Sequence, residues 1–125
     1  MKIKTSELTD VQLAYAIGQI DPDAWVYDNL RIGKLYGKVS TMLYDHPDGE
    51  ALQYSPASNW AQGGPIIERE FIRIQPESPY WEAGTYTDAG DCFVGVGETP
   101  LIAAMRCYVA SKLGDEIEIP QELVA

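Results

Sequence analysis

"TPLIAAMRCYVASKLG", residues 99–114, decides the fold because it predicts a helix that belongs inside the protein. Thr99 can cap this helix, Pro100 suits its first position, and Gly114 marks its end. Between these signals the residues are apolar on almost every side, which is typical of a buried helix rather than a surface helix. A buried helix needs other elements packed around it, and the neighbouring sequence supplies them.

Three stretches before this helix have the β-branched and aromatic character of strands: "FIRIQ" (71–75), "WEAGTYT" (81–87) and "DCFVGVG" (91–97). The residues "TDAGD" (87–91) suit a hairpin loop between the last two. Beyond the helix, "EIEIP" (116–120) alternates between acidic and apolar residues. We expect an edge strand there, ending at Pro120.

A second helix is predicted near the start of the chain. Thr9 is a good N-cap and Gln12 follows three residues later, so the pair has the spacing of a capping box. Leu8 and Leu13 have the spacing of a hydrophobic staple across that cap. Apolar residues then recur at helical spacing, and "DPD" at 21–23 ends the helix.

The region between these helices is less regular. Residues 24–56 show no clear hydrophobic period, although "WVY" (25–27) and "KVSTML" (38–43) are compatible with short strands and "HPDG" (46–49) signals a turn. We interpret this region as irregular. In "NWAQGGPIIERE" (59–70), the two glycines permit positive φ and the proline suits a helix start. We therefore expect a turn at the glycines, followed by a short helix over 66–70.

Together these elements predict an α+β fold in a single domain of residues 1–125. The expected architecture is a small, mainly antiparallel sheet of three to four strands, packed by an N-terminal and a C-terminal helix in a sandwich-like arrangement. A chain of 125 residues can build a real core, because roughly two-thirds of the unfolded surface is buried at this size.

The net charge of −10, from nine basic and nineteen acidic residues, bounds the function. Affinity for nucleic acid comes largely from Lys and Arg that neutralise phosphates, so we expect no direct nucleic-acid binding. An acidic surface also repels anionic membranes and attracts basic proteins. The start "MKIKTSELTD" lacks the apolar core of a signal peptide, and no apolar run approaches membrane-spanning length. We expect a cytoplasmic protein that does not bind membranes.

The residue inventory contains no recognisable catalytic or metal-binding motif. His46 is the single histidine and lies in a polar turn signal. Cys92 and Cys107 fit neither a disulfide scaffold nor a zinc motif, and Cys107 reads as a small buried hydrophobe. The many paired carboxylates are expected on a solvated face rather than around a metal. We expect no enzymatic activity, no cofactor and no bound metal.

Four charged residues are candidates for a structural polar cluster: Glu68, Arg69, Glu70 and Arg106. A buried arginine must be paired, because an uncompensated buried charge costs several kcal/mol. We expect Arg106 to pack its stem against the sheet and to bond an acid from the 68–70 turn.

Candidate binding residues are Trp60, Gln62 and Gly63, together with the aromatic residues Trp25 and Tyr27. If exposed, Trp60 is suited to anchor an interface. If buried, it would pin its loop to the core. The high average burial of tryptophan favours the buried position.

The stretches "YSPASNWAQGGPIIERE" (54–70) and "ETPLIAAMRCYVASKLGDEIEIP" (98–120), with "MKIKTSELT" (1–9), resemble the NinX family of small proteins from lambdoid phages and prophages. The pattern is also similar to phage αβα-sandwich domain proteins. The resemblance implies a layered α+β fold and an accessory phage protein in the cytoplasm of a bacterial host, with a host or phage protein as partner. It implies no enzyme, cofactor or catalytic residue.

We interpret the chain as a non-catalytic protein-binding module. One alternative is an acidic mimic of duplex DNA that occupies a DNA-binding protein. A small metal-assisted hydrolase would instead need carboxylates converging with His46. A capsid or assembly component would show a large apolar patch.

Overall fold

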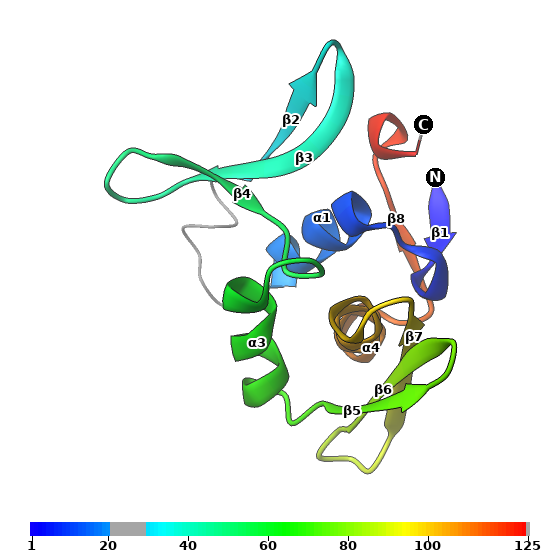
Figure 1. Ribbon diagram of the computed structural model, residues 1–125. Coiled ribbons are helices and arrows are strands. Elements are labelled where there is room, and N and C mark those ends of the chain that lie inside the picture. The colour runs from blue at the N-terminus through cyan, green and yellow to red at the C-terminus, as the bar shows by residue number, and fades with distance from the viewer. Residues whose placement is uncertain (21–29, 125) are drawn as a thin grey trace.

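The computed structural model describes residues 1–20 and 30–124, which form an α+β fold as predicted (Figure 1). The helices are α1 (Asp10–Ile20), α3 (Trp60–Arg69) and α4 (Pro100–Leu113), with short 3-10 turns η1 (Thr5–Glu7) and η2 (Gln121–Leu123). The strands are β1 (Lys2–Lys4), β2 (Arg31–Leu35), β3 (Lys38–Asp45), β4 (Ala51–Tyr54), β5 (Arg73–Glu77), β6 (Tyr80–Tyr86), β7 (Cys92–Gly97) and β8 (Glu116–Glu118).

Helix α4 is the centre of the molecule, as its apolar sequence predicts. In Figure 1 it is seen end-on, with α1 above it, α3 beside it and the β5-β6-β7 sheet below it. Met105, Cys107 and Val109 are fully buried on it. The predicted cap is confirmed, since Thr99 Oγ1 accepts a hydrogen bond from the Ile102 N–H at 3.2 Å. The helix ends at Gly114, which has a positive φ of 91°.

Helix α4 lies directly on β7 because β7 presents glycines to it. A Cβ atom on Gly95 would lie 2.2 Å from the Ala103 carbonyl oxygen and 2.4 Å from the Cys107 nitrogen. A Cβ on Gly97 would lie 2.7 Å from the Ala103 nitrogen. Any side chain at these positions would therefore hold the helix backbone away from the strand.

The β5-β6-β7 sheet is an antiparallel meander, and the three predicted strands are confirmed. The first strand is shifted from the predicted residues 71–75: β5 begins at Arg73, since Phe71 has a positive φ of 52°. The hairpin loop over 87–91 is closed by a 2.9 Å bond from the Thr87 N–H to the Asp91 carbonyl, with Gly90 at a positive φ. On the inner face, Ala83 and Thr85 are buried. Residues of the outer face, including Tyr86 and Val94, are exposed.

The predicted first helix is also confirmed. The Thr9 N–H donates to Gln12 Oε1 at 3.0 Å, which is one half of a capping box. The Gln12 side chain is buried, and its Nε2 donates to the Leu123 carbonyl at 2.9 Å. This bond connects η2 to α1. Leu8 and Leu13, the expected staple, are both fully buried.

The interpretation of residues 24–56 as irregular was wrong where the structure describes them, because β2, β3 and β4 form a second antiparallel sheet. Strand β3 turns Met42 and Tyr44 inward, and the ring of Tyr44 meets Tyr54 edge-on. The period was obscured by a register shift between Gly33 and Lys34 and by a tight turn at 36–37, where both residues have positive φ. The candidate strand 25–27 lies outside the described residues.

The expected turn at Gly63 and Gly64 was also wrong. Helix α3 begins at Trp60, where Asn59 Oδ1 accepts a bond from the Ala61 N–H at 2.9 Å, and it runs through both glycines to Arg69. Gly63 serves close packing, since a Cβ there would lie 2.3 Å from the Pro56 carbonyl oxygen and 2.7 Å from Leu101 Cδ2. The glycine therefore lets α3 approach the start of α4.

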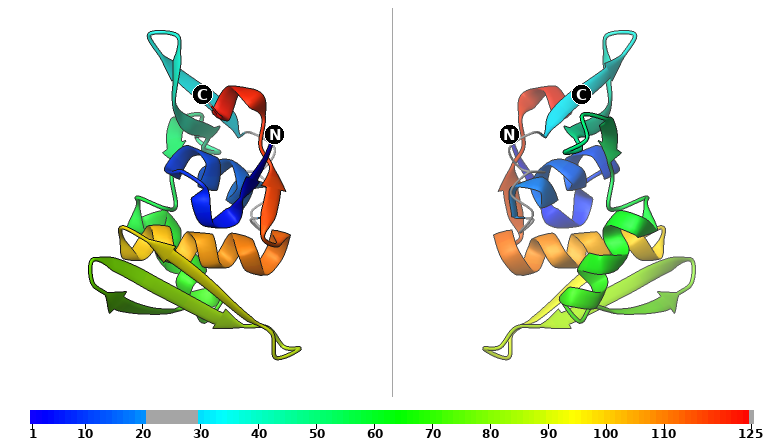
Figure 2. Two further views of the ribbon diagram at one scale, coloured as in Figure 1. Left: turned by 90° about the vertical axis from the view of Figure 1, so that its right-hand side faces the viewer. Right: turned by 90° about the vertical axis from the view of Figure 1, so that its left-hand side faces the viewer.

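The two ends of the described chain are joined. Strand β1 pairs with β8, the predicted edge strand, and the amino group of Met1 bonds Glu118 Oε1 at 3.0 Å. Figure 2 shows both ends on the same side of α1. No described helix combines the length and the apolar character needed to cross a membrane.

The two cysteines differ in reactivity. Cys92 is exposed, whereas burial, with a smaller effect of Cys92, raises the pKa of Cys107 to about 11 from 9.0. At pH 8 we expect a thiol reagent to modify one cysteine per folded chain and two after denaturation. Because the pKa of the Cys107 thiol is higher in the folded protein than in the unfolded chain, this thiol contributes to the free energy of unfolding below pH 9. The contribution is lost as the pH rises towards 11. Rapid modification of both thiols in the folded protein would contradict this assignment.

Candidate functional site

Helix α3 carries most of the residues that the sequence marks as candidates, and a hollow lies at each of its ends. Trp60 lines one hollow at the N-terminal end. Arg69 and Glu70 line the other at the C-terminal end. Trp60 and the acids of residues 68–70 therefore do not share a cleft among the described residues.

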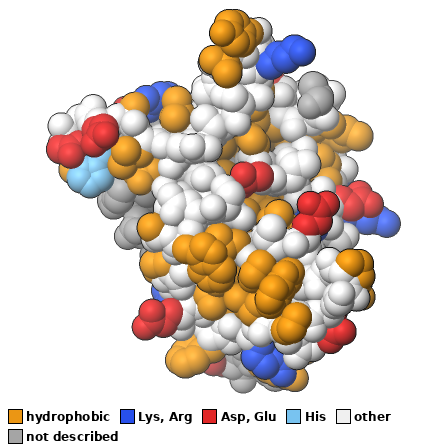
Figure 3. All heavy atoms as spheres, viewed as in Figure 1, with side chains coloured by type: hydrophobic (Ala, Val, Ile, Leu, Met, Phe, Trp, Pro, Cys, Tyr) orange, Lys and Arg blue, Asp and Glu red, His pale blue; other side chains and the backbone are white. Residues whose placement is uncertain are grey.

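The hollow at the N-terminal end, which we call the Trp60 groove, has a volume of about 250 Å³. It is lined by Asp10, Ala57, Ser58, Trp60, Thr99, Pro100, Leu101 and Ile102. These residues come from the starts of α1, α3 and α4 and from the loop before α3. In Figure 3, hydrophobic side chains gather on this face, over α3 and α4.

Trp60 is 56% exposed, so the expectation that it is buried was wrong. It lies one turn before Gly63, which is buried against Pro56 and Leu101. The buried core therefore ends at the helical turn that contains Gly63. The indole of Trp60 lies beyond this turn and forms part of the groove wall. Its position resembles that of an interface anchor more than that of a core residue.

Asp10, one of the residues that line the Trp60 groove, has a buried carboxylate oxygen. Asp10 Oδ1 has almost no solvent contact, and no described residue donates a hydrogen bond to it. Asp10 is in the first turn of α1, where the helix dipole favours a negative charge. The Trp60 groove therefore has apolar walls and one acidic lining residue, whose buried oxygen Oδ1 receives no hydrogen bond from the described residues.

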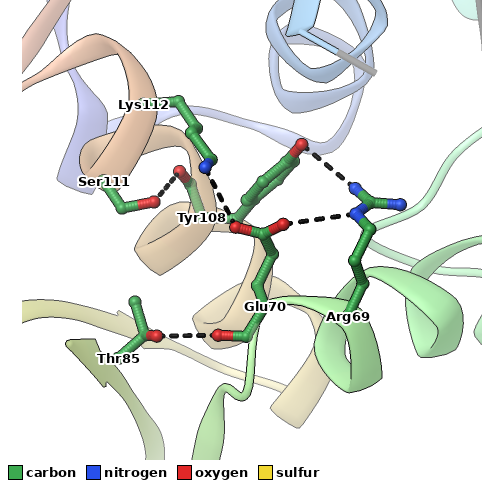
Figure 4. Close-up of polar contacts among 6 residues, drawn as sticks. All are labelled: Arg69, Glu70, Thr85, Tyr108, Ser111 and Lys112. Carbon is green, nitrogen blue, oxygen red and sulfur yellow. Dashed lines mark hydrogen bonds and ion pairs between the residues drawn. The ribbon is translucent and has the colours of Figure 1, made fainter. Parts of the chain in front are cut away.

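The hollow at the other end of α3 contains a closed polar cluster (Figure 4). Arg69 Nε donates to Glu70 Oε2 at 3.2 Å, and Arg69 Nη2 donates to the Tyr108 hydroxyl at 3.2 Å. Lys112 Nζ lies 3.1 Å from the other oxygen of Glu70. Thr85 Oγ1 donates to the Glu70 carbonyl at 2.8 Å. These contacts join the end of α3 to α4 and β6.

The electrostatics of this cluster fit a structural role. Burial acts to lower the pKa of Arg69, but the hydrogen bond to Glu70 and the contact with Tyr108 outweigh it and leave the pKa raised. Both cations meet the same carboxylate, so neither charge is left for a ligand without breaking an ion pair. Glu68 is exposed and lies outside the cluster.

The predicted bond between Arg106 and an acid of residues 68–70 was wrong. Arg106 Nη2 and Nε donate to the Leu8 carbonyl at 2.9 and 3.2 Å, and Nη1 donates to the Val96 carbonyl at 2.8 Å. This face of α4 points towards β7 and the start of α1. Burial lowers the pKa of Arg106, and nearby Glu98 acts in the opposite direction.

The other predicted binding residues are not brought to the groove surface. Gln62 uses its amide within the fold, accepting from the Ser55 N–H at 2.7 Å and donating to the Gln53 carbonyl at 2.8 Å. Gly63 is buried. Trp25 and Tyr27 lie outside the described residues.

The turn at 46–49 does not assemble a metal site with the described residues. His46 Nδ1 lies 3.2 Å from Asp48 Oδ1 in an open turn. The pKa of Asp48 is lowered, mainly by the hydrogen bond from the Glu50 N–H. No group of three or more His, Cys, Asp or Glu residues that could hold a metal occurs in residues 1–20 and 30–124.

Comparison with known proteins adds one finding. A family model described as "Bacteriophage P22, NinX" matches residues 4–112, from β1 to the last turn of α4. The match includes every residue that lines the Trp60 groove. No curated protein matches the chain.

Proposed function

Since the chain belongs to the NinX family of phage proteins, we propose that this phage accessory protein binds a host or phage protein through the Trp60 groove and performs no catalysis of its own. The observation that carries the proposal is the exposed indole of Trp60 beside an apolar groove. Exposed tryptophans that can insert into a partner supply much of the binding energy of protein interfaces.

The groove also indicates the chemistry of the partner. Its apolar walls, formed by Trp60, Leu101 and Ile102, suit an aliphatic or aromatic side chain. Oδ1 of the lining residue Asp10 has no donor among the described residues, and an unpaired buried acceptor carries a desolvation cost of about 1–3 kcal/mol. The net charge of −10 favours association with a basic surface. We therefore expect the partner to insert an apolar side chain next to an arginine or lysine.

The experiment compares Trp60→Ala with wild type in capture from a lysate of phage-infected host cells, followed by titration of the purified captured protein. We expect the affinity to fall by about 30-fold or more, the effect of losing roughly 2 kcal/mol at a hot spot. Tyr36→Ala is the matched control, since Tyr36 is 95% exposed at the distant β2–β3 turn. Equal binding by wild type and Trp60→Ala would remove the groove from the proposal.

A further inference from the structure

Strand β7 is an edge strand: no described strand pairs with its outer side, where Arg106 Nη1 donates to the Val96 carbonyl at 2.8 Å. The sheet order is β5-β6-β7, and β7 pairs with β6 alone among the described strands. The bond from the Thr87 N–H to the Asp91 carbonyl fixes the pairing pattern of the hairpin. Phe93, Gly95 and Gly97 face β6 with their backbone groups, so those of Cys92, Val94 and Val96 point outward.

The outer edge of β7 lacks most of the features that protect edge strands, apart from the Arg106 side chain at the Val96 carbonyl. Natural edges are blunted by charged side chains, prolines, bulges or covering groups, because an open edge invites pairing with another chain. The sequence of β7, "CFVGVG", contains no charge and no proline, and its register with β6 is continuous. Val94 and Val96 are 50% and 40% exposed beside it.

Most other edges in the described structure carry charges or a proline. Strand β5, at the opposite edge of the same sheet, contains Pro76 and the charged residues Arg73 and Glu77. Strand β2 has the register shift at 33/34 and two basic residues. Strands β1 and β8 are rich in charge. Strands β4 and β7 have neither charge nor proline, and on each a side chain donates to one carbonyl. Strand β7 is the longer of these two uncharged edges, with six residues against four.

A hollow of about 450 Å³ lies beside β7. It is lined by Val94, Val96 and Arg106, and also by Lys4, Ser6 and Glu116 from β1, η1 and β8. Arg106 Nη1 already donates to the Val96 carbonyl. A carbonyl oxygen has two lone pairs, so Val96 can accept a second bond from a neighbouring strand.

We propose that β7 pairs with β7 of a second copy of this chain, antiparallel and centred on Val94. This register places Val94 opposite Val94, and Cys92 opposite Val96, so that the outward-facing groups of each strand meet those of its partner. The strand is its own complement: it brings uncharged, β-branched residues together and places no like charges within the paired strands. The result is a two-fold dimer with a continuous six-stranded sheet.

A single cysteine on the two-fold axis tests the register. In the variant Cys92→Ser with Val94→Cys, the two Cα atoms would be about 5.5 Å apart, within the reach of a disulfide. We expect mild oxidation to convert this variant to a covalent dimer, while buried Cys107 does not react. The matched control is Cys92→Ser with Gln75→Cys, which places the exposed cysteine on the protected β5 edge. Equal cross-linking of the two variants, or none in either, would overturn the proposal.

Sedimentation tests the contact without a covalent bond. An edge-to-edge contact is small, so we expect the mass of the wild type to rise with protein concentration from 13.8 kDa towards twice that value. Val94→Lys places two like charges on the axis and is expected to remain at 13.8 kDa. Val94→Thr keeps a β-branched, uncharged residue and is expected to behave like the wild type. A wild type that stays monomeric up to about 1 mM protein would contradict the dimer.

Discussion

Gly95→Ala is expected to destabilise the protein by more than about 3 kcal/mol, because the new methyl group would collide with backbone atoms that cannot turn away. The obstacles are the Ala103 carbonyl oxygen at 2.2 Å and the Cys107 nitrogen at 2.4 Å. Overpacking against flexible side chains costs roughly 1–3 kcal/mol, and relief here would require moving the whole of α4 off β7. Since domains of this size are stable by about 5–15 kcal/mol in total, the loss should be evident in urea or guanidinium unfolding.

Gly64→Ala provides the matched control for this prediction. Gly64 is a helix glycine whose added Cβ would meet nothing within 4 Å beyond neighbouring residues of its own helix. Alanine should change the free energy of unfolding by less than about 1 kcal/mol, because its higher helix propensity is opposed by the contact of its Cβ with the ring of Pro65, the next residue in α3. If Gly95→Ala unfolded at the same denaturant concentration as the wild type, α4 could not be seated on β7 as described.

The second large effect is expected for Arg106→Met, which keeps an unbranched side chain but removes the guanidinium. The change leaves the carbonyls of Leu8 and Val96 without three donated hydrogen bonds. We expect a loss of about 3 kcal/mol, because hydrogen bonds from a charged donor contribute roughly 1.5–3 kcal/mol and the Leu8 carbonyl lies in the interior. The measurement is the free energy of unfolding from urea denaturation.

Two further variants serve as comparisons for Arg106→Met. Arg106→Lys should recover less than half of the loss, since one ammonium group cannot reach both carbonyls in the way that a planar guanidinium does. Arg31→Met removes an exposed arginine that pairs with Asp45, and should change stability by less than about 1 kcal/mol. A loss for Arg106→Met no larger than that for Arg31→Met would show that Arg106 does not join β7 to the start of α1.

The parts of the fold that were predictable are those whose signals are local. The caps at Thr9 and Thr99, the apolar run of α4 and the hairpin residues at 87–91 each act over a few neighbouring positions. The start of α3 was missed because a glycine pair before a proline has two uses, a turn or a close helix contact. Only the position of Leu101, distant in sequence, decides between them.

The second sheet was missed because a register shift in β2 and an aromatic turn hide its alternation. The partners of Arg106 could not be predicted for a different reason. They are backbone carbonyls, which every residue carries, so the sequence gives no signal that distinguishes Leu8 or Val96 from other positions.

In the Trp60 groove, Trp60 itself was predicted from the sequence, but the other residues that line the groove were not. The sequence marked Trp60, but Asp10 and Ile102 reach the groove only because three helices start at the same place. The starts of α1 and α4 were signalled by their caps, but the start of α3 was missed, and no pattern in one sequence shows that the three starts meet. The exposure of Trp60 was misjudged because the sequence does not show that the core ends one turn away from this residue.

The hydrogen bonds between β1 and β8 make the backbone almost a closed ring. The position of the break in this ring matters little to the packing around α4, because Met1 is exposed and no residue of β1 or β8 lines the Trp60 groove. A short linker could bridge them, and a circularly permuted chain cut at an exposed turn such as 36–37 would retain every neighbour that the present order provides.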